Sequence, residues 1–181
     1  MTSSLPDVIA LVGFMGSGKT TIGKLLAERL GRVFVDLDTR IEESTGMSIP
    51  DYFKNFGEPK FRAIEAETLG AEIGKGRAVV LACGGGIVEN QDNRSTLTGC
   101  CMTIWLDIPE AELIRRLRDD HSGRPMLSGD LESRIKLLFA RRYSLYESTA
   151  GIRHSWESGE TASATVDAIT ARLEAIAGKL L

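Results

Sequence analysis

The sequence predicts an α/β fold in which helices flank a five-stranded parallel sheet in three layers. Short apolar runs alternate with stretches in which apolar residues recur at helical spacing, as in repeated strand–helix units. The 181 residues, 43% of them hydrophobic and 26% charged, suffice for one domain with a sizeable core. No internal repeat or low-complexity linker divides the chain. A single domain over residues 1–181 is therefore expected.

The first two strands and the helix between them are predicted near the N-terminus. An apolar run at 8–13 predicts the first strand, and helix 19–30 follows, with Gly31 as its expected C-terminal stop. The second strand, 33–38, ends in two acidic residues. The helix carries four apolar side chains on one face: Ile22, Leu25, Leu26 and Leu30.

Two helical segments are expected before the third strand. Ser48 with Asp51 matches a capping box, which predicts a short helix that closes near Gly57. Pro59 stands where a new helix can begin, and the pattern continues to about Lys75.

The second half of the chain repeats the alternation. Strands are predicted at 78–83, 102–107 and 152–156, and helices after Pro109, over 131–147 and at the C-terminus. Residues 119–130 are polar and contain glycine, the composition of a mobile loop. The inward-facing apolar residues of the first and last of these helices are Leu113, Ile114, Leu117, Val166, Ile169, Leu173 and Ile176.

Charge and composition exclude several classes of protein. The net charge is −3, so no broad basic surface indicates a nucleic-acid or membrane partner. Residues 1–7 are short and polar, unlike a secretory signal, and the apolar run after them is too short to span a bilayer. We therefore expect a cytoplasmic protein. We also expect a monomer, which charge and composition do not decide.

The cysteines and histidines do not predict a metal site. Cys83, Cys100 and Cys101 lie in apolar, strand-like runs and are expected to be small buried thiols in a reducing cytosol. His121 and His154 have no cysteine or carboxylate at ligand spacing, which argues against a zinc site or a catalytic triad.

A phosphate-binding loop follows the first strand. Residues 13–20 read Gly-Phe-Met-Gly-Ser-Gly-Lys-Thr, a full match to G-x-x-x-x-G-K-[ST] between a strand and an amphipathic helix. The glycines let successive N–H groups point at phosphate oxygens, and the helix N-terminus adds its positive dipole end. Lys19 can reach the β- and γ-phosphates, and the Thr20 hydroxyl can bind Mg²⁺. The motif predicts a P-loop NTPase-type fold that binds a nucleoside triphosphate with Mg²⁺, and it leaves the acceptor open.

Two further features stand at the carboxyl ends of strands, where ligands gather in open α/β sheets. Alternation along a strand would place Asp36 and Asp38 on one side, facing the loop, one for Mg²⁺ and one for an alcohol. The same acids could cap the next helix, with Asp38 or Thr39 as the N-cap. The triple glycine at 84–86 could be a flexible turn or a point of close ligand approach. The short chain leaves no room for motor or switch domains, which favours a small kinase.

Taken together, the motifs resemble those of the shikimate kinase family. The segments G-F-M-G-S-G-K-T-T-I-G, D-L-D-T-R-I-E, G-E-P-K-F-R-A-I-E, the triple glycine and R-P-M-L occur in this order between about Val8 and Tyr146. The resemblance implies ATP-dependent phosphorylation of the 3-hydroxyl of shikimate, giving shikimate 3-phosphate and ADP for chorismate biosynthesis. It also implies a substrate-binding helical segment at about 38–75 and a mobile lid at about 119–130.

The resemblance assigns the groups that transfer the phosphate. Lys19, Asp38 and Arg124 would be catalytic, with Asp38 holding the substrate hydroxyls and Arg124 reaching the phosphates from the lid. Thr20 would bind the metal ion directly, and Asp36 would lie near it. The implied nucleotide-binding residues are Gly13, Gly16, Ser17, Gly18, Lys19, Thr20, Thr21, Arg116 and Arg124.

The resemblance also assigns the residues that hold the substrate. Arg62 would grip the carboxylate of shikimate and be oriented by Glu65, and Arg142 would be the second carboxylate partner. By spacing alone, Arg62 with Glu65 could be a surface ion pair, and Arg141 could replace Arg142. The implied substrate-binding residues are Asp38, Arg62, Gly84, Gly85, Gly86 and Arg142.

One stretch departs from the family pattern. Members often carry an arginine or lysine near the adenine after the fifth strand, whereas residues 157–162 are acidic here. Purine recognition in this region could then rest on backbone groups. Arg116 matches a position that stacks on adenine, although spacing alone does not separate it from Arg115.

Two alternatives remain open from the sequence. Another small kinase, acting on gluconate or a nucleoside monophosphate, would share the phosphate loop. A catalytically silent module that binds nucleotide and signals through a partner would also retain it. Turnover with a hydroxylated carboxylate separates these alternatives.

Overall fold

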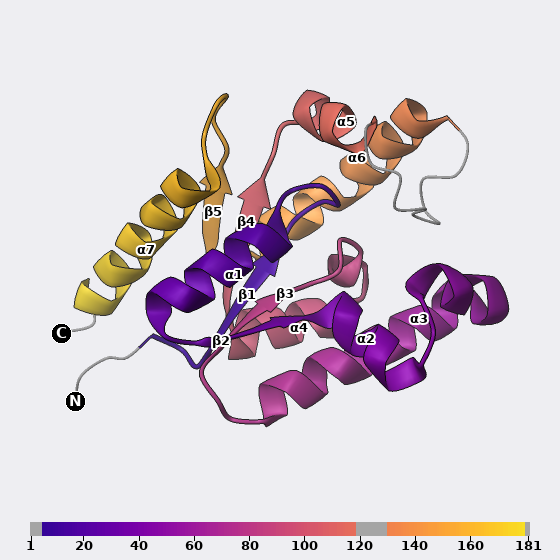
Figure 1. The fold of residues 1–181 in the computed structure, drawn as a ribbon, viewed down its shortest axis with the longest axis horizontal. Coiled ribbons are helices and arrows are strands. Elements are labelled where there is room, and N and C mark those ends of the chain that lie inside the picture. Colours follow the sequence, from indigo (N-terminus) through magenta and orange to yellow (C-terminus); the bar gives the residue numbers. More distant parts are fainter. Residues whose placement is uncertain (1–4, 119–129, 180–181) are drawn as a thin grey trace.

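In the computed structural model, which describes residues 5–118 and 130–179, five parallel strands form one sheet (Figure 1). Their spatial order is β2 (Val33–Asp36), β3 (Val79–Ala82), β1 (Val8–Val12), β4 (Met102–Asp107) and β5 (Ile152–Ser155). The predicted five-stranded parallel sheet is thus confirmed, and the strand that leads into the phosphate loop lies at its centre.

Helices cover both faces of the sheet. On one face lie α1 (Lys19–Leu30) and α7 (Ala162–Lys179), and on the other lie α3 (Ile49–Gly74), α4 (Gln91–Cys100) and α6 (Leu131–Thr149). The remaining helices are α2 (Leu37–Thr45), the 3₁₀ turn η1 (Ile87–Glu89) and α5 (Glu110–Arg118). None of the helices in the described part of the chain is long and apolar enough to cross a membrane.

The core follows from the alternation of side chains along the strands. In β1, Ile9 and Leu11 pack with the α1 and α7 layer, whereas Ala10 and Val12 pack with the opposite layer. All are fully buried. Since the central strands β1 and β3 are covered on both faces, they are buried and apolar throughout, which explains the continuous apolar runs in the sequence. The edge strand β5 instead alternates, with Arg153 and Ser155 exposed.

Helix α1 has the predicted bounds, and Gly31 ends it in the left-handed conformation, at a φ of 62°. Ile22 and Leu26 are buried as expected, but Leu25 is 38% exposed, so its assignment to the buried face was wrong. Helix α4 was not predicted. Its sequence is almost entirely polar, and Leu97 is its one buried apolar residue, so it lacks the periodicity that would announce a helix.

The second strand is shorter than predicted. It ends at Asp36, whose side chain caps α2 by accepting a hydrogen bond from the backbone N–H of Asp38 at 3.1 Å. Asp38 is therefore helical, and the predicted strand alternation of the two acids was wrong. The N-cap is Asp36, and neither Asp38 nor Thr39 takes that place.

The predicted break between two helical segments is confirmed. The Ser48 hydroxyl accepts from the backbone N–H of Asp51 at 3.2 Å and opens α3. The helix kinks at Gly57, where φ is 77° and ψ is 170°, and Pro59 lies in the first turn beyond the kink. The kink lets the first part of α3 lie over the end of the sheet.

The thiols are less uniformly buried than predicted. Cys83 is buried and Cys101 is partly buried, but Cys100 is exposed because it ends a helix and is not in a strand. Burial raises the pKa of Cys101 to about 12. All three are free cysteines.

We expect Gly23→Ala to destabilise the protein. A Cβ at this position would lie 2.5 Å from the ring of Phe34 and 3.3 Å from Leu11 Cδ1, so the ring could not keep its present packing against α1. Overpacking of this kind lowers the free energy of unfolding by about 1–3 kcal/mol, measured by urea titration. Gly70→Ala is the control, because the space around Gly70 is open and alanine favours the helix by about 0.5–1 kcal/mol. Equal stability of the two variants would contradict the predicted clash.

Candidate active site

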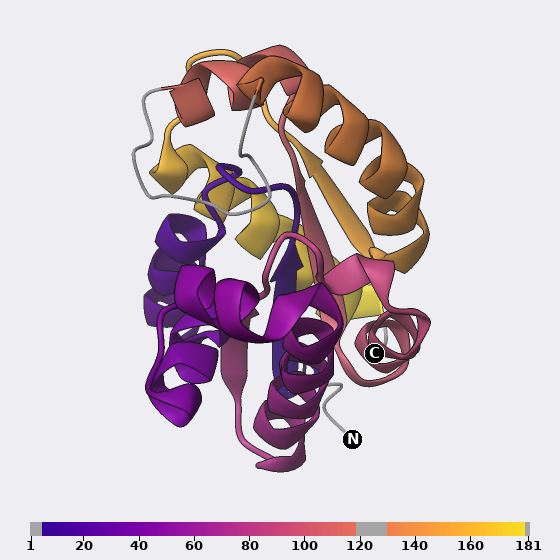
Figure 2. The ribbon, with the colours of Figure 1, turned by 90° about the vertical axis from the view of Figure 1, so that its right-hand side faces the viewer.

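The carboxyl ends of the strands open into a cavity of about 530 Å³. Helix α2 and the first part of α3 lie on one side of these strand ends, and α5 lies on the other (Figure 1 and Figure 2). The cavity is lined by Met15, Gly16, Gly18, Lys19, Thr20, Thr21, Asp36, Asp38, Thr39, Glu42, Ile49, Pro50, Phe53, Phe61, Arg62, Glu65, Ala82, Cys83, Gly84, Gly85, Gly86 and Arg142.

The phosphate loop has the backbone that its glycines predict. Gly13, Gly16 and Gly18 have positive φ values of 147°, 78° and 90°. A Cβ at Gly13 would lie 2.8 Å from the carbonyl oxygen of Leu106, so the loop also needs glycine for lack of space. Gly18 is the N-cap of α1 and provides no side chain to cap it. The first N–H groups of α1 are thus available to an anion.

Lys19 lies across the phosphate loop. Its ammonium donates hydrogen bonds to the carbonyl oxygens of Gly13 and Phe14, both at 2.8 Å. These bonds hold the positive charge beside the backbone N–H groups that would meet a phosphate. The arrangement is that of an anion-binding loop with one cationic side chain held beside it.

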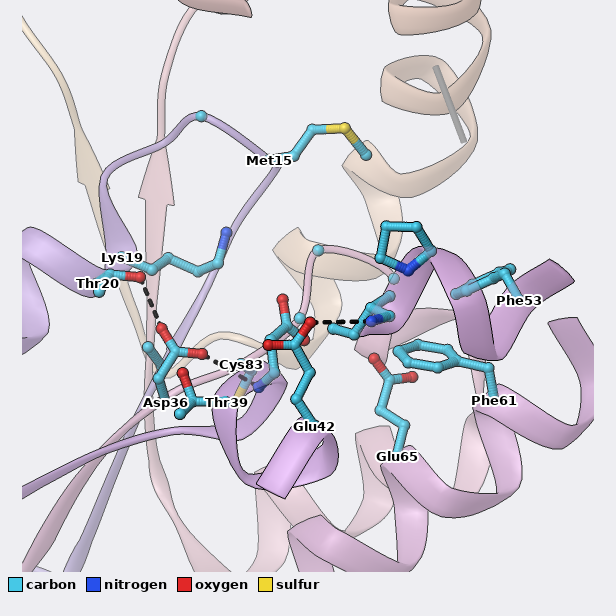
Figure 3. Close-up of a pocket in the computed structure, with 18 of the residues that line it drawn as sticks. Met15, Lys19, Thr20, Asp36, Thr39, Glu42, Phe53, Phe61, Glu65 and Cys83 are labelled. Carbon is cyan, nitrogen blue, oxygen red and sulfur yellow. Dashed lines mark hydrogen bonds between the residues drawn. The ribbon is translucent and has the colours of Figure 1, made fainter. Parts of the chain in front are cut away.

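A hydroxyl and a carboxylate meet beside the loop (Figure 3). The Thr20 hydroxyl donates to Asp36 Oδ2 at 2.7 Å, and both residues line the cavity. Oxygen donors of these two kinds suit Mg²⁺, which keeps waters and phosphates for its other positions. No group of three or more His, Cys, Asp or Glu side chains within residues 5–118 and 130–179 could hold a metal ion. The Thr20 hydroxyl and the Asp36 carboxylate therefore fit Mg²⁺ as two of its oxygen ligands.

Two carboxylates converge on the turn after β3. A Cβ at Gly84 would lie 2.7 Å from Glu65 Oε1 and 3.0 Å from Asp38 Oδ1, so glycine is required there. Glu65 is 1% exposed, and burial raises its pKa despite the opposing attraction of Arg62. Its Oε1 atom has no hydrogen-bond partner. A buried acceptor in this state is suited to a hydroxyl of a bound ligand.

The ion pair between Arg62 and Glu65 does not lie at the surface. The Arg62 side chain is 16% exposed and donates to Glu65 at 2.9 Å and to Glu58 at 3.1 Å. Desolvation opposes the charge, but the two glutamates outweigh it and raise the pKa of Arg62. A Cβ at Gly86 would lie 2.2 Å from Arg62 Nη2. The guanidinium therefore packs directly against Gly86 in the turn at residues 84–86, which we call the glycine turn.

Arg142 is the more deeply buried arginine, at 1% exposure. Its Nε donates to Glu89, and neither Nη1 nor Nη2 has a hydrogen-bond partner. Arg141 is 62% exposed and does not line the cavity, so the structure separates two residues that spacing left equivalent. Because unpaired buried donors are costly, the two free nitrogens indicate a site for an anionic ligand.

A second cavity of about 210 Å³ lies on the other side of the phosphate loop. Arg116 Cζ lies 5.0 Å from the centre of the Trp156 ring, and both residues line this cavity. Arg115 is 69% exposed and does not line it. The acidic stretch contributes Glu160, which pairs with His154 at 2.8 Å. Side chains from the acidic stretch and from Arg116 and Trp156 therefore line this cavity, and recognition of a purine by backbone groups stays a prediction.

The structure brings most of the predicted residues together. Gly16, Gly18, Lys19, Thr20, Thr21, Asp36, Asp38, Arg62, Gly84, Gly85, Gly86 and Arg142 line the first cavity, and Ser17 and Arg116 line the second. Gly13 shapes the loop and accepts from Lys19. Arg124, and the predicted lid at 119–130 apart from Asp130, lie outside the described residues.

Several residues of the site were missed from the sequence. Phe53 and Phe61 form an apolar wall of the first cavity, with ring centroids 4.5 Å apart across the Gly57 kink. Glu42 lines the same cavity and accepts from the backbone N–H of Ile49 at 2.9 Å. Only the helical spacing of the aromatic residues could have indicated the wall, and nothing in the sequence singled out Glu42.

Comparison with known proteins gives a consistent result. A family model described as shikimate kinase matches residues 15–174. The shikimate kinase of Synechococcus elongatus is 45% identical over 160 residues, 88% of this chain and 82% of that protein. A solved shikimate kinase from Acinetobacter baumannii in complex with shikimate has a TM-score of 0.86 at 36% identity, covering 99% of this chain and 97% of that one. A gluconokinase from Sinorhizobium meliloti, covering 98% of this chain and 97% of its own, is only 16% identical, with a TM-score of 0.54, a likeness of fold alone.

We expect Arg116→Ala to weaken ATP binding and Arg115→Ala to leave it unchanged. Both arginines pair with Glu112, so they are matched in their local ion pairs, but only Arg116 faces Trp156 and the second cavity. Loss of a partly desolvated cation–π partner corresponds to about 0.5–2 kcal/mol of binding free energy. Calorimetric titration with ATP measures the difference, and equal affinities in the two variants would contradict the prediction that Arg116 stacks on the adenine ring.

Proposed function

The chain belongs to the shikimate kinase family, and on that premise we propose that its larger cavity transfers the γ-phosphoryl group of ATP to the 3-hydroxyl of shikimate. One observation carries this proposal. The phosphate loop shares a cavity with a buried arginine whose two terminal nitrogens have no partner. A substrate that joins a hydroxyl to a carboxylate satisfies both ends of such a cavity. The Acinetobacter relative in complex with shikimate supports the same ligand.

The carboxylate of shikimate would bind between Arg62 and Arg142. Each guanidinium is a planar set of N–H donors, and each is held by a glutamate: Arg62 by Glu65, which also lines the cavity, and Arg142 by Glu89, which does not. Gly86 lets the ring approach the turn without a side chain between them. Charge and shape at this end would thus select a flat, monoanionic substrate.

Asp38 would hold the hydroxyls of the substrate at the opposite end. It lies between Glu65 and the phosphate loop, and the unpartnered Glu65 Oε1 provides a second acceptor nearby. Accepting a hydrogen bond from the attacking hydroxyl fixes the oxygen that faces the nucleotide. The hydroxyl proton would pass toward Asp38 as the new phosphate ester forms.

The phosphate loop would stabilise the charge that develops during transfer. The N–H groups at the start of α1 and the Lys19 ammonium surround the position of the phosphates. Thr20 and Asp36 would hold Mg²⁺, which neutralises phosphate charge when bound. Arg116 and Trp156 would contact the adenine ring. The roles of Arg124 and of a lid remain predictions.

We also propose that the protein acts as a monomeric, single-domain enzyme in the cytosol. The large apolar side chains that the described residues expose belong to four different elements, and this supports a monomer: Leu25, Val33, Phe56 and Leu137. The three free cysteines fit a reducing compartment.

The direct test is ADP formation from Mg-ATP by the purified protein, with shikimate and gluconate offered in separate reactions. Saturable ADP release with shikimate alone supports the proposal. Release with gluconate alone, or binding of ATP without turnover on either acceptor, would overturn it.

We predict that Arg62→Ala weakens shikimate binding by roughly 2–5 kcal/mol, because it leaves the carboxylate and Glu65 without their shared partner. Arg62→Lys should fall between wild type and Arg62→Ala, since lysine keeps the charge but not the planar set of donors. Lys60→Ala, at an exposed cation of the same helix, is the matched control. Titration calorimetry with shikimate gives the affinities of the three variants and of the wild type. A wild-type affinity in Arg62→Ala would remove Arg62 from the site.

A further inference from the structure

We infer that Glu89, which lies outside the cavity, is a positioning residue that sets the carboxylate affinity of the site through Arg142. The inference rests on the proposed function and adds a residue to it. Glu89 is the last residue of η1, five positions after the start of the glycine turn, and it is not among the residues that line the cavity. It therefore acts on the ligand only through a neighbour.

The contacts of Glu89 point to that neighbour. Its Oε1 accepts from Arg142 Nε at 2.5 Å, and its Oε2 accepts from Arg141 at 2.7 Å. The Glu89 side chain is 8% exposed and that of Arg142 is 1% exposed, so this pair is removed from solvent. Arg141, by contrast, reaches Glu89 from the surface.

The geometry of the guanidinium explains what the pair does. A guanidinium has one Nε donor and two terminal nitrogens in a single plane. With Nε bound to Glu89, Nη1 and Nη2 have no protein partner and belong to a side chain that lines the cavity. The ring of Phe14 lies 5.7 Å from Cζ and limits rotation of the group. Glu89 thereby fixes which two nitrogens meet the ligand.

Glu89 is itself held rigidly by the turn that carries it. Its backbone N–H donates to the carbonyl of Gly86 at 3.0 Å, and Arg94 donates to the carbonyl of Glu89 at 3.2 Å. One helical turn beyond Arg142, the Tyr146 hydroxyl donates to the carbonyl of Gly85. These hydrogen bonds fix the position of Arg142 relative to the glycine turn, and Glu89 joins the two through its ion pair with Arg142.

If the ion pair between α6 and η1 were purely structural, its removal would have different measurable effects. Its loss would lower stability and affect both substrates alike. A positioning role instead changes kcat/KM for shikimate, leaves KM for ATP unchanged, and disappears when Arg142 is absent. The two roles are therefore separable by experiment.

The experiment is a double-mutant cycle on the full chain, with Glu89→Ala, Arg142→Met and the combined variant. The readout is kcat/KM at subsaturating shikimate, which stays measurable when KM is high. Glu89→Ala should lower this value by about tenfold to a hundredfold, the range for losing a hydrogen bond to a charged group. Glu89→Gln, which retains an acceptor for Nε, should recover part of the loss. In the Arg142→Met background, Glu89→Ala should have no further effect.

Glu147→Gln is the control. Glu147 is an exposed glutamate on α6, the helix that carries Arg142, and this variant should behave as wild type. Thermal unfolding of every variant separates loss of folded protein from loss of function. Equal losses from Glu89→Ala in the wild-type and Arg142→Met backgrounds would overturn the inference, as would a parallel rise in KM for ATP. If the wild-type chain turns over shikimate and Glu89→Ala has the same kcat/KM, the inference is overturned but the proposed function is not. A wild-type chain inactive on shikimate overturns the proposed function as well.

Discussion

The buried positive charge at the carboxyl end of the sheet is the constraint on which much of this structure depends. Arg62 and Arg142 place largely buried guanidinium groups at the wall of the cavity, and each is paired with one buried glutamate. Burying such groups is unfavourable unless partners surround them. The glycine turn supplies the space, since a side chain at Gly86 would collide with Arg62. The site is in this sense prepared for an anion before the anion arrives.

The opposite end of the cavity follows a different principle. There the phosphate loop uses backbone N–H groups and the start of α1, and Lys19 is its main charged side chain. Such a cradle is local in sequence, so eight consecutive residues predicted it fully. The charge pairs of the carboxylate end join residues up to 53 positions apart, as Arg142 and Glu89 are. No local pattern encodes such a contact.

This difference explains how far the sequence could be used. Apolar runs and capping residues predicted every strand and most helices. A strand buried on both faces appears in the sequence as a continuous apolar run, and a helix end in the left-handed conformation appears as a glycine. The end of β2 at Asp36 was missed because the Asp36 side chain caps the next helix there. Helix α4 was missed because its sequence is polar and its place depends on packing against the rest of the fold. Spacing alone did not separate Arg142 from Arg141; the family resemblance selected Arg142, and its burial in the structure agrees with that choice. Glu89 carried no signal at all until its contacts were seen.

In the proposed function, Arg62 and Arg142 recognise the carboxylate of the substrate. The most direct test is calorimetric titration of the protein with shikimate and with its neutral carboxamide, which keeps the ring and the hydroxyls. The account predicts that the carboxamide binds at least about thirtyfold more weakly, because it leaves the guanidinium charges without a counterion. Equal affinity for the two compounds would contradict it.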